Sequence, residues 1–247
     1  MKLHSLFVTG VLVMSVIASA FPAKATTASE ALEYDRYTDL SMPGYLEEFA
    51  NAVNSAQMTF NTSYPLSTTE VNDECVALMN GKMISGDVGR ALSEIFIENS
   101  SKLDNLTSGG SVSAKYCPKY SKMTVKEKSI VWVFILTAMA HFESSCSRTA
   151  NTKGPNGTVY GYYQLHRGKE DAYDGGKGFC KKGDAGKPVA ASKCTLGMLE
   201  KQFEVRQGEL FSPKSYWDVL RPQGHAKKAG IIKKALMRSS LCNPQTI

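Results

Sequence analysis

The most constraining feature of the chain is one long apolar segment that ends in a single carboxylate. Thr124 and Glu127 form a T-x-x-E capping box, which predicts that a helix begins there. The segment then runs through the apolar stretch IVWVFILTAMA to Glu143. A helix that is apolar on nearly every side has to be buried, so we expect this segment to be the central helix of a mainly α domain.

The N-terminus has the pattern of a targeting segment. Lys2 precedes the apolar stretch LFVTGVLVMSVIASA, which is too short to span a bilayer comfortably, and Ala18–Ala20 forms a small-x-small cleavage site. A second such site lies at Ala23–Ala25. We predict a signal peptide at residues 1–20, an N-terminal extension at 21–65 and a main domain at 66–247. The protein is therefore expected to be secreted or periplasmic.

All six cysteines follow the predicted signal peptide, and an even number in an exported chain favours disulfide bonds. Fifteen pairings are possible, and we favour Cys180 with Cys194 because these two enclose a short loop. No pair has C-x-x-C spacing, so we expect no metal site and no cofactor. The candidate disulfide cysteines are Cys75, Cys117, Cys146, Cys180, Cys194 and Cys242.

Periodicity predicts the remaining elements. Tyr45, Phe49 and Val53 mark one amphipathic helix in the extension. In the main domain we expect helices over 67–81, opened by an S-x-x-E capping box, over 87–100 and 192–208, and a C-terminal one within HAKKAGIIKKALMRSS. Strand patterns are scarce, and a short hairpin around residues 158–165 is the best candidate for β structure.

The charge balance is mildly basic, with 29 Lys and Arg against 23 Asp and Glu. Such a surplus suits an anionic polymer such as a cell wall, or a membrane surface, but it also serves solubility. An exported chain without a basic-aromatic cluster is a poor candidate for nucleic-acid binding. The lysine-rich C-terminal helix could lie on a membrane surface, but we expect it to pack through its apolar face, without stable membrane insertion.

Glu143 is the candidate catalytic residue. It shares the helix face of Leu136, Met139 and Ala140, where burial disfavours a charged carboxylate. The C-terminal end of a helix disfavours it as well, and no cation follows within four residues. These effects raise the pKa, and a carboxyl that stays protonated near neutral pH is what a general acid requires.

The stretch HFESSCSRTANTKGPNGTVYGYYQLH resembles the goose-type lysozyme and lytic transglycosylase family. That family has an apolar helix ending in Glu-Ser, a loop with Asn, and then Gly-x-x-Gln-Leu. Glu143, Ser144, Asn151, Gly161 and Gln164 match these positions, whereas the later Ala-x-x-Tyr-Asn motif is missing. The resemblance implies a disulfide-stapled lysozyme-like fold and cleavage of the β-1,4 bond between N-acetylmuramic acid and glucosamine-type sugars.

The resemblance also implies roles for single residues. Glu143 would be the catalytic acid, Ser144 would order the glutamate or the helix end, and Gly161 would let the backbone approach the glycan. Gln164 would bind a sugar or hold the hairpin. One of Tyr162 and Tyr163 would face the groove. The segment SYWDVL could replace the missing motif through Tyr216 or Trp217, and Cys146 would tie down the loop after Glu143.

Several alternatives remain open at this point. Residues 144–169 contain no Asp or Glu, which favours internal transfer over hydrolysis, although Asp171, Asp174, Asp184 or a more distant residue could supply a second carboxylate. The cysteine-rich chain also resembles a lysozyme of predatory bacteria that prefers deacetylated peptidoglycan. The expected partner is the peptidoglycan glycan strand, bound by a monomer. The rival interpretations are a non-catalytic wall-binding or effector protein and a membrane-active toxin. A zinc peptidase is disfavoured because HFESSC lacks the two-histidine spacing.

Overall fold

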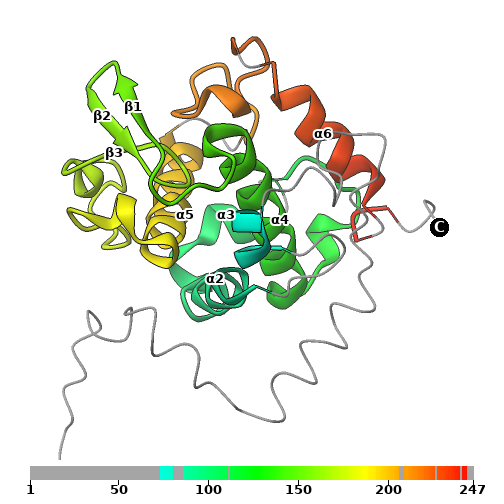
Figure 1. The fold of residues 1–247 in the computed structure, drawn as a ribbon. Coiled ribbons are helices and arrows are strands. Elements are labelled where there is room, and N and C mark those ends of the chain that lie inside the picture. The colour runs from blue at the N-terminus through cyan, green and yellow to red at the C-terminus, as the bar shows by residue number, and fades with distance from the viewer. Residues whose placement is uncertain are drawn as a thin grey trace, which may run out of the picture.

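The computed structural model describes residues 73–79, 86–108, 110, 112–205, 209–225, 227–239 and 241–243 (Figure 1). The predicted signal peptide, the extension at 21–65 with its helix, and the capping box near residue 67 lie outside these ranges. The described part is mainly helical, with one small antiparallel sheet and three disulfide bonds. This is the disulfide-stapled, lysozyme-like class that the sequence predicts.

Helix α4, Val125–Ser144, occupies the centre of the molecule as predicted (Figure 1). Its capping box is present: the Glu127 N–H donates to the Thr124 side chain, and the Glu127 carboxylate accepts from the Thr124 N–H. Every residue from Lys128 to Ala140 is buried. Because this part of α4 is buried on all sides, apolar residues are found on nearly every face of the helix.

The other helices pack around α4. Helix α2, Asp87–Glu98, contacts both α4 and α5, and the Ser93 and Ser129 hydroxyls join α2 to α4 at 2.7 Å. Helix α5, Pro188–Val205, begins earlier than predicted, because proline is well suited to the first turn of a helix. The remaining α-helices are α3, Asp104–Thr107, and α6, Ala229–Arg238.

The sequence predicts an α-helix over 67–81, but residues 73–79, the described part of this segment, have another structure. It forms a short 3₁₀ helix, Asp73–Ala77, and Cys75 within it is fully buried in a disulfide. A tight turn fixed by a covalent bond replaces the amphipathic helix that the periodicity indicated. The other 3₁₀ helices are Ser100–Lys102, Tyr120–Lys122, Glu170–Ala172, Asp184–Gly186 and Asp218–Leu220.

The sheet has the order β1-β2-β3, and both pairings are antiparallel. Strands β2, Gly157–Tyr160, and β3, Leu165–His166, lie in the predicted hairpin region. Strand β1, Asn151–Gly154, was not predicted, because its side chains are largely exposed and give no alternating pattern. In Figure 1 the sheet lies on one side of α4 and helix α6 on the other.

The disulfides join Cys75 to Cys146, Cys117 to Cys242, and Cys180 to Cys194. The predicted Cys180–Cys194 pair is confirmed, and Cys146 does tie down the loop after Glu143. The first two bonds join cysteines that are 71 and 125 positions apart in the sequence, so they strongly restrict the conformations of the unfolded chain. Three disulfides are consistent with a secreted or periplasmic protein.

Glu200 is a buried acid whose contribution to the stability of the fold can be measured. Its side chain is 1% exposed and accepts hydrogen bonds from the Asn105 amide group and the Leu106 N–H. In Glu200→Gln an NH₂ group would face one of these donors, so we expect the free energy of unfolding to fall by roughly 2–4 kcal/mol. Urea denaturation followed by circular dichroism measures the change.

Glu204→Gln is the matched control, one turn further along α5. The Glu204 side chain is 47% exposed and pairs with Lys177 and Lys201 at the surface, where solvent screens the charges, so its loss should change the free energy of unfolding far less than the loss of Glu200. Equal destabilisation by the two substitutions would contradict the role assigned to Glu200.

Candidate active site

An open cleft of about 610 Å³ lies at the C-terminal end of α4. Its walls come from that helix end, the sheet, α5 and the segment 214–221. Glu143, Gln164 and Tyr216, three of the predicted site residues, line it. The other lining residues are Thr152, Gly154, Pro155, Asn156, Val159, His166, Tyr173, Met198, Lys201, Gln202, Val205, Lys214, Ser215, Trp217, Asp218 and Arg221.

The end of α4 is held in a defined position. Ser145 and Cys146 both take left-handed backbone conformations, with φ of 52° and 59°, which stops the helix directly after Ser144. The Ser144 hydroxyl lies 3.1 Å from the Ala140 carbonyl oxygen and 2.9 Å from that of Tyr162. Ser144 therefore joins the helix end to the turn after β2, which fixes the position of its neighbour Glu143.

Burial raises the pKa of Glu143 to about 7. A hydrogen bond from the Val219 N–H lowers it, the Asp218 carboxylate raises it and the Arg221 guanidinium lowers it. The predicted direction and its main cause, burial, agree with the structure. No cation follows Glu143 within four residues of the sequence, but folding brings Arg221 close to its carboxyl. A glutamate with this pKa is protonated in about half of the molecules at neutral pH.

The segment Ser215–Arg221 carries the groups that surround Glu143. Arg221 braces it: Nε donates to the Ser215 carbonyl oxygen at 2.8 Å and Nη2 donates to that of Tyr216 at 3.3 Å. The Trp217 indole N–H donates to the Tyr163 carbonyl oxygen at 2.9 Å, and Trp217 is buried. The segment is thus fixed both to itself and to the turn that follows β2.

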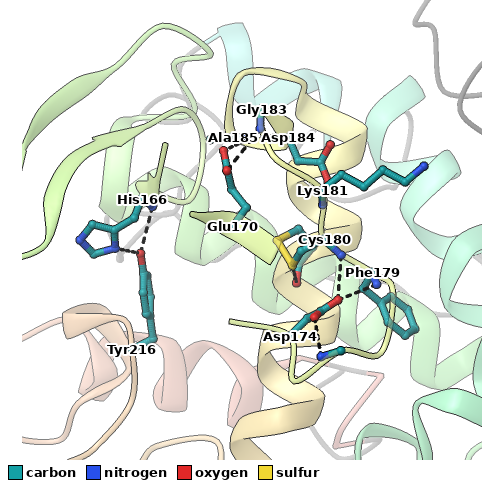
Figure 2. Close-up of a disulfide and its surroundings, with 12 residues drawn as sticks. His166, Glu170, Asp174, Phe179, Cys180, Lys181, Gly183, Asp184, Ala185 and Tyr216 are labelled. Carbon is teal, nitrogen blue, oxygen red and sulfur yellow. Dashed lines mark hydrogen bonds between the residues drawn. A yellow bond between two sulfur atoms is a disulfide. The ribbon is translucent and has the colours of Figure 1, made fainter. Parts of the chain in front are cut away.

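Tyr216 is held in the cleft by His166 (Figure 2). The His166 N–H donates to the Tyr216 hydroxyl at 3.2 Å, and Nδ1 of the ring lies 2.5 Å from it. The Asn156 N–H donates to Nε2 of the same ring at 3.3 Å, which places the proton of the neutral ring on Nδ1. Burial lowers the pKa of His166 and keeps the ring neutral. The Tyr216 hydroxyl thus receives two hydrogen bonds and donates its own proton to the Gln164 carbonyl oxygen at 3.4 Å.

The turn between β2 and β3 is built from the Gly-x-x-Gln motif. Gln164 has a positive φ of 48° and its side-chain amide donates to the Gly161 carbonyl oxygen at 2.9 Å. Gly161 has φ of 72°, and a Cβ there would lie 2.0 Å from the Ala185 carbonyl oxygen. Glycine is therefore required because the backbone at Ala185 approaches closely. The resemblance implied instead that the glycan would approach Gly161.

The two tyrosines of the motif belong to the core. Tyr162 and Tyr163 are 2% and 0% exposed, and neither lines the cleft. The prediction that one of them faces the groove assumed the alternation of a strand, but residues 161–164 form a turn. The Tyr163 hydroxyl instead bonds to Ser192 of α5 at 2.9 Å. The aromatic side chains that line the cleft are instead those of Tyr173, Tyr216 and Trp217.

The acidic residues between 170 and 184 stabilise loops (Figure 2). Buried Glu170 accepts from the Gly183 and Ala185 N–H groups, and buried Asp174 accepts from the Phe179 and Cys180 N–H groups. Asp184 accepts from the Lys181 N–H at 2.6 Å. Asp171 is exposed, and none of these four acids lines the cleft. The second carboxylate of the cleft is Asp218, which the sequence analysis did not single out.

Within the part of the chain that the structure describes, no group of three or more His, Cys, Asp or Glu residues is arranged to hold a metal ion. The same residues include no helix that is long and apolar enough to cross a membrane.

Comparison with known proteins gives a match at the level of structure. No family model matches the chain, and no curated protein matches it. The structure is similar to that of Bd0314 DslA, a Bdellovibrio protein, with a TM-score of 0.51. The wild-type form of DslA is 25% identical, over 63% of this chain and 92% of DslA. Two DslA variants with a glutamate changed to glutamine match over the same shares, at 24% and 23% identity.

The electrostatics of Glu143 can be measured directly. We expect its side-chain carboxyl to titrate with a pKa of about 7 in carbon-detected NMR. Asp218→Asn should lower that pKa because it removes a neighbouring negative charge, and Arg221→Gln should raise it because it removes a positive one. Asp171→Asn, at an exposed position away from the cleft, is the control and should change nothing. A midpoint near 4.5, the ordinary value for glutamate, would contradict the burial of Glu143.

Proposed function

We propose that this protein is a peptidoglycan glycosidase that cleaves the β-1,4 bond between N-acetylmuramic acid and glucosamine-type sugars. The observation that carries the proposal is the pKa of about 7 of Glu143 in an open cleft. A protonated carboxyl in such a position can donate its proton to the glycosidic oxygen as the sugar leaves. The resemblance of the Glu-Ser and Gly-x-x-Gln motifs to goose-type lysozymes and lytic transglycosylases supports the same reaction.

The other groups of the cleft fit a polymeric sugar substrate. Tyr173 and Tyr216 offer aromatic faces against which a pyranose ring can pack, and hydrogen bonds with His166 and Gln164 hold the Tyr216 hydroxyl in place. Burial raises the pKa of Tyr216, and the nearby Glu143 carboxyl raises it further. Tyr216 therefore stays a neutral hydroxyl throughout the pH range in which Glu143 titrates.

Hydrolysis and internal transfer differ in their need for a second carboxylate. A hydrolase uses one to direct water or to form a covalent intermediate, whereas in transfer the 6-hydroxyl of muramic acid attacks. Asp218 is close enough to raise the pKa of Glu143, which makes it the candidate for the second role. Mass spectrometry of the released fragments distinguishes the two, because transfer leaves a 1,6-anhydro end and hydrolysis a reducing end.

Glu143→Gln tests the reaction itself. The amide has no proton to donate, so we expect the rate of fragment release from purified peptidoglycan to fall by about 10²–10⁴-fold. Activity of the wild type should decline as the pH rises through about 7, where Glu143 loses its proton. Thermal unfolding shows whether the variant is folded. Unaltered lysis by the variant, or no lysis by the folded wild type, would favour the non-catalytic wall-binding protein instead.

The preference for deacetylated wall forms the finer part of the proposal. Removal of the acetyl group leaves a cationic amine on glucosamine, which needs a carboxylate near its subsite. Asp218 lines the cleft and is the carboxylate that accompanies Glu143 there. We expect faster digestion of chemically deacetylated than of acetylated wall, and we expect Asp218→Asn to reduce that ratio. Faster digestion of the acetylated wall by the wild-type protein would end the idea.

A further inference from the structure

The excess positive charge of the protein is concentrated at its C-terminal end. Residues 210–247 contain seven Lys and Arg residues and one acidic residue, Asp218. The preceding 209 residues contain 22 basic and 22 acidic residues and are neutral overall. The excess of +6 in this last stretch equals the formal net charge of the chain. Such asymmetry within a chain indicates an anionic partner for the basic part.

Five of the seven basic residues lie on or just before helix α6. We call them the basic surface. Three are exposed and two are half-buried. The set comprises Lys227, Lys228, Lys233, Lys234 and Arg238.

Two of the lysines extend over aromatic rings. Lys233 Nζ lies 4.8 Å from the ring centroid of Phe211 and 5.3 Å from that of Tyr116. Lys228 Nζ lies 5.0 Å from that of Phe142. Phe142 directly precedes Glu143, so the basic surface begins beside the helix end that carries the candidate catalytic acid.

The four lysines of the basic surface have no acidic partner among the described residues, and two of them oppose the dipole of α6. Among the described residues, no Asp or Glu forms an ion pair with any of the four lysines. Lys227 and Lys228 stand at the N-terminal end of α6, which has no acidic residue in its first turn and no side-chain cap. Positive charge at that end opposes the helix dipole. A group of lysines without a carboxylate partner among the described residues leaves positive charge available to an anionic ligand.

A bilayer is a poor partner for this surface. Membrane-surface helices insert an apolar face below the headgroups. The apolar face of α6 is already used, since Ala229, Ile232 and Leu236 are at most 1% exposed. The disulfide between Cys117 and Cys242 holds the chain just after α6 against the main body. The side chains that remain outward are mainly charged, with Met237 the one large apolar side chain exposed on α6 among the described residues, and such a surface suits a hydrated polyanion.

We propose that the basic surface binds the carboxylates of the peptide stems of peptidoglycan and so holds the wall against the cleft; this choice of polymer rests on the proposed function. Stem carboxylates repeat along the glycan, so several lysines can engage one strand at the same time. Binding of this kind is multivalent, depends on salt and needs no single tight subsite.

The test compares two sets of four substitutions that change the net charge equally. In the first set Lys227, Lys228, Lys233 and Lys234 are all changed to Gln. In the control set Lys102, Lys181, Lys182 and Lys187, all exposed and outside the basic surface, are changed to Gln. Both sets are made in Glu143→Gln protein so that the wall is not degraded, and circular dichroism checks the fold. Co-sedimentation with purified peptidoglycan at increasing salt measures the binding.

We expect the first set to weaken binding by about tenfold or more and to flatten its salt dependence, and the control set to have a much smaller effect. Chemical amidation of the wall carboxylates should weaken binding of the parent protein to a similar degree. Equal effects of the two sets, or unchanged binding to the amidated wall, would overturn the proposal. So would a first-set defect that appears with anionic phospholipid vesicles and not with wall.

The inference and the proposed function can fail separately. The same substitutions in otherwise wild-type protein should leave cleavage of short glycan fragments without peptide stems unchanged, and slow cleavage of intact wall. If the wild type cleaves neither substrate but wall binding still depends on the basic surface, the glycosidase assignment fails and the binding surface stands. Slower cleavage of the stem-free fragments would show that the lysines act in the cleft, against the proposal.

Discussion

The site depends on one long-range contact: the segment Ser215–Arg221 lies against the end of α4 and buries Glu143. Without this cover the carboxyl at the helix end would be hydrated and charged at neutral pH. With this cover in place, burial raises the pKa of Glu143 to about 7. Val219 and Arg221 lower that pKa, and Asp218 raises it. Keeping an acid in such a place costs stability, a common cost of functional sites. The fold offsets it with three disulfides and a capped central helix.

The carboxylates of this protein divide into two groups by their surroundings. Glu170, Asp174 and Glu200 are fully or almost fully buried, but each accepts several N–H hydrogen bonds, so their charge is satisfied by the backbone. Glu143 has one backbone donor and faces an open cleft. Glu143 is also only half-buried, so both its exposure and its hydrogen bonding separate the candidate acid catalyst from the structural acids.

Much of the framework could be predicted because its causes are local in sequence. The capping box at Thr124, the all-round apolar helix and the glycine and glutamine of the turn each act within a few residues, and all are found. Of the disulfides, only the short Cys180–Cys194 loop could be paired, since spacing carries no information on bonds that join distant segments. Strand β1 gave no pattern because its side chains face solvent. Tyr162 and Tyr163 both lie in the core, and the prediction that one faces the groove is wrong because residues 161–164 form a turn without the alternation of a strand.

Local pattern was enough to place a carboxylate at the end of a buried helix, because capping and hydrophobic periodicity act within a few residues. The size of its pKa shift and the groups around it come from tertiary packing. Tyr216, Asp218 and Arg221 follow Glu143 at a great distance along the chain, and His166 acts on the cleft through Tyr216. Their juxtaposition comes from the packing of whole elements and from disulfides between distant segments, and no local periodicity records it.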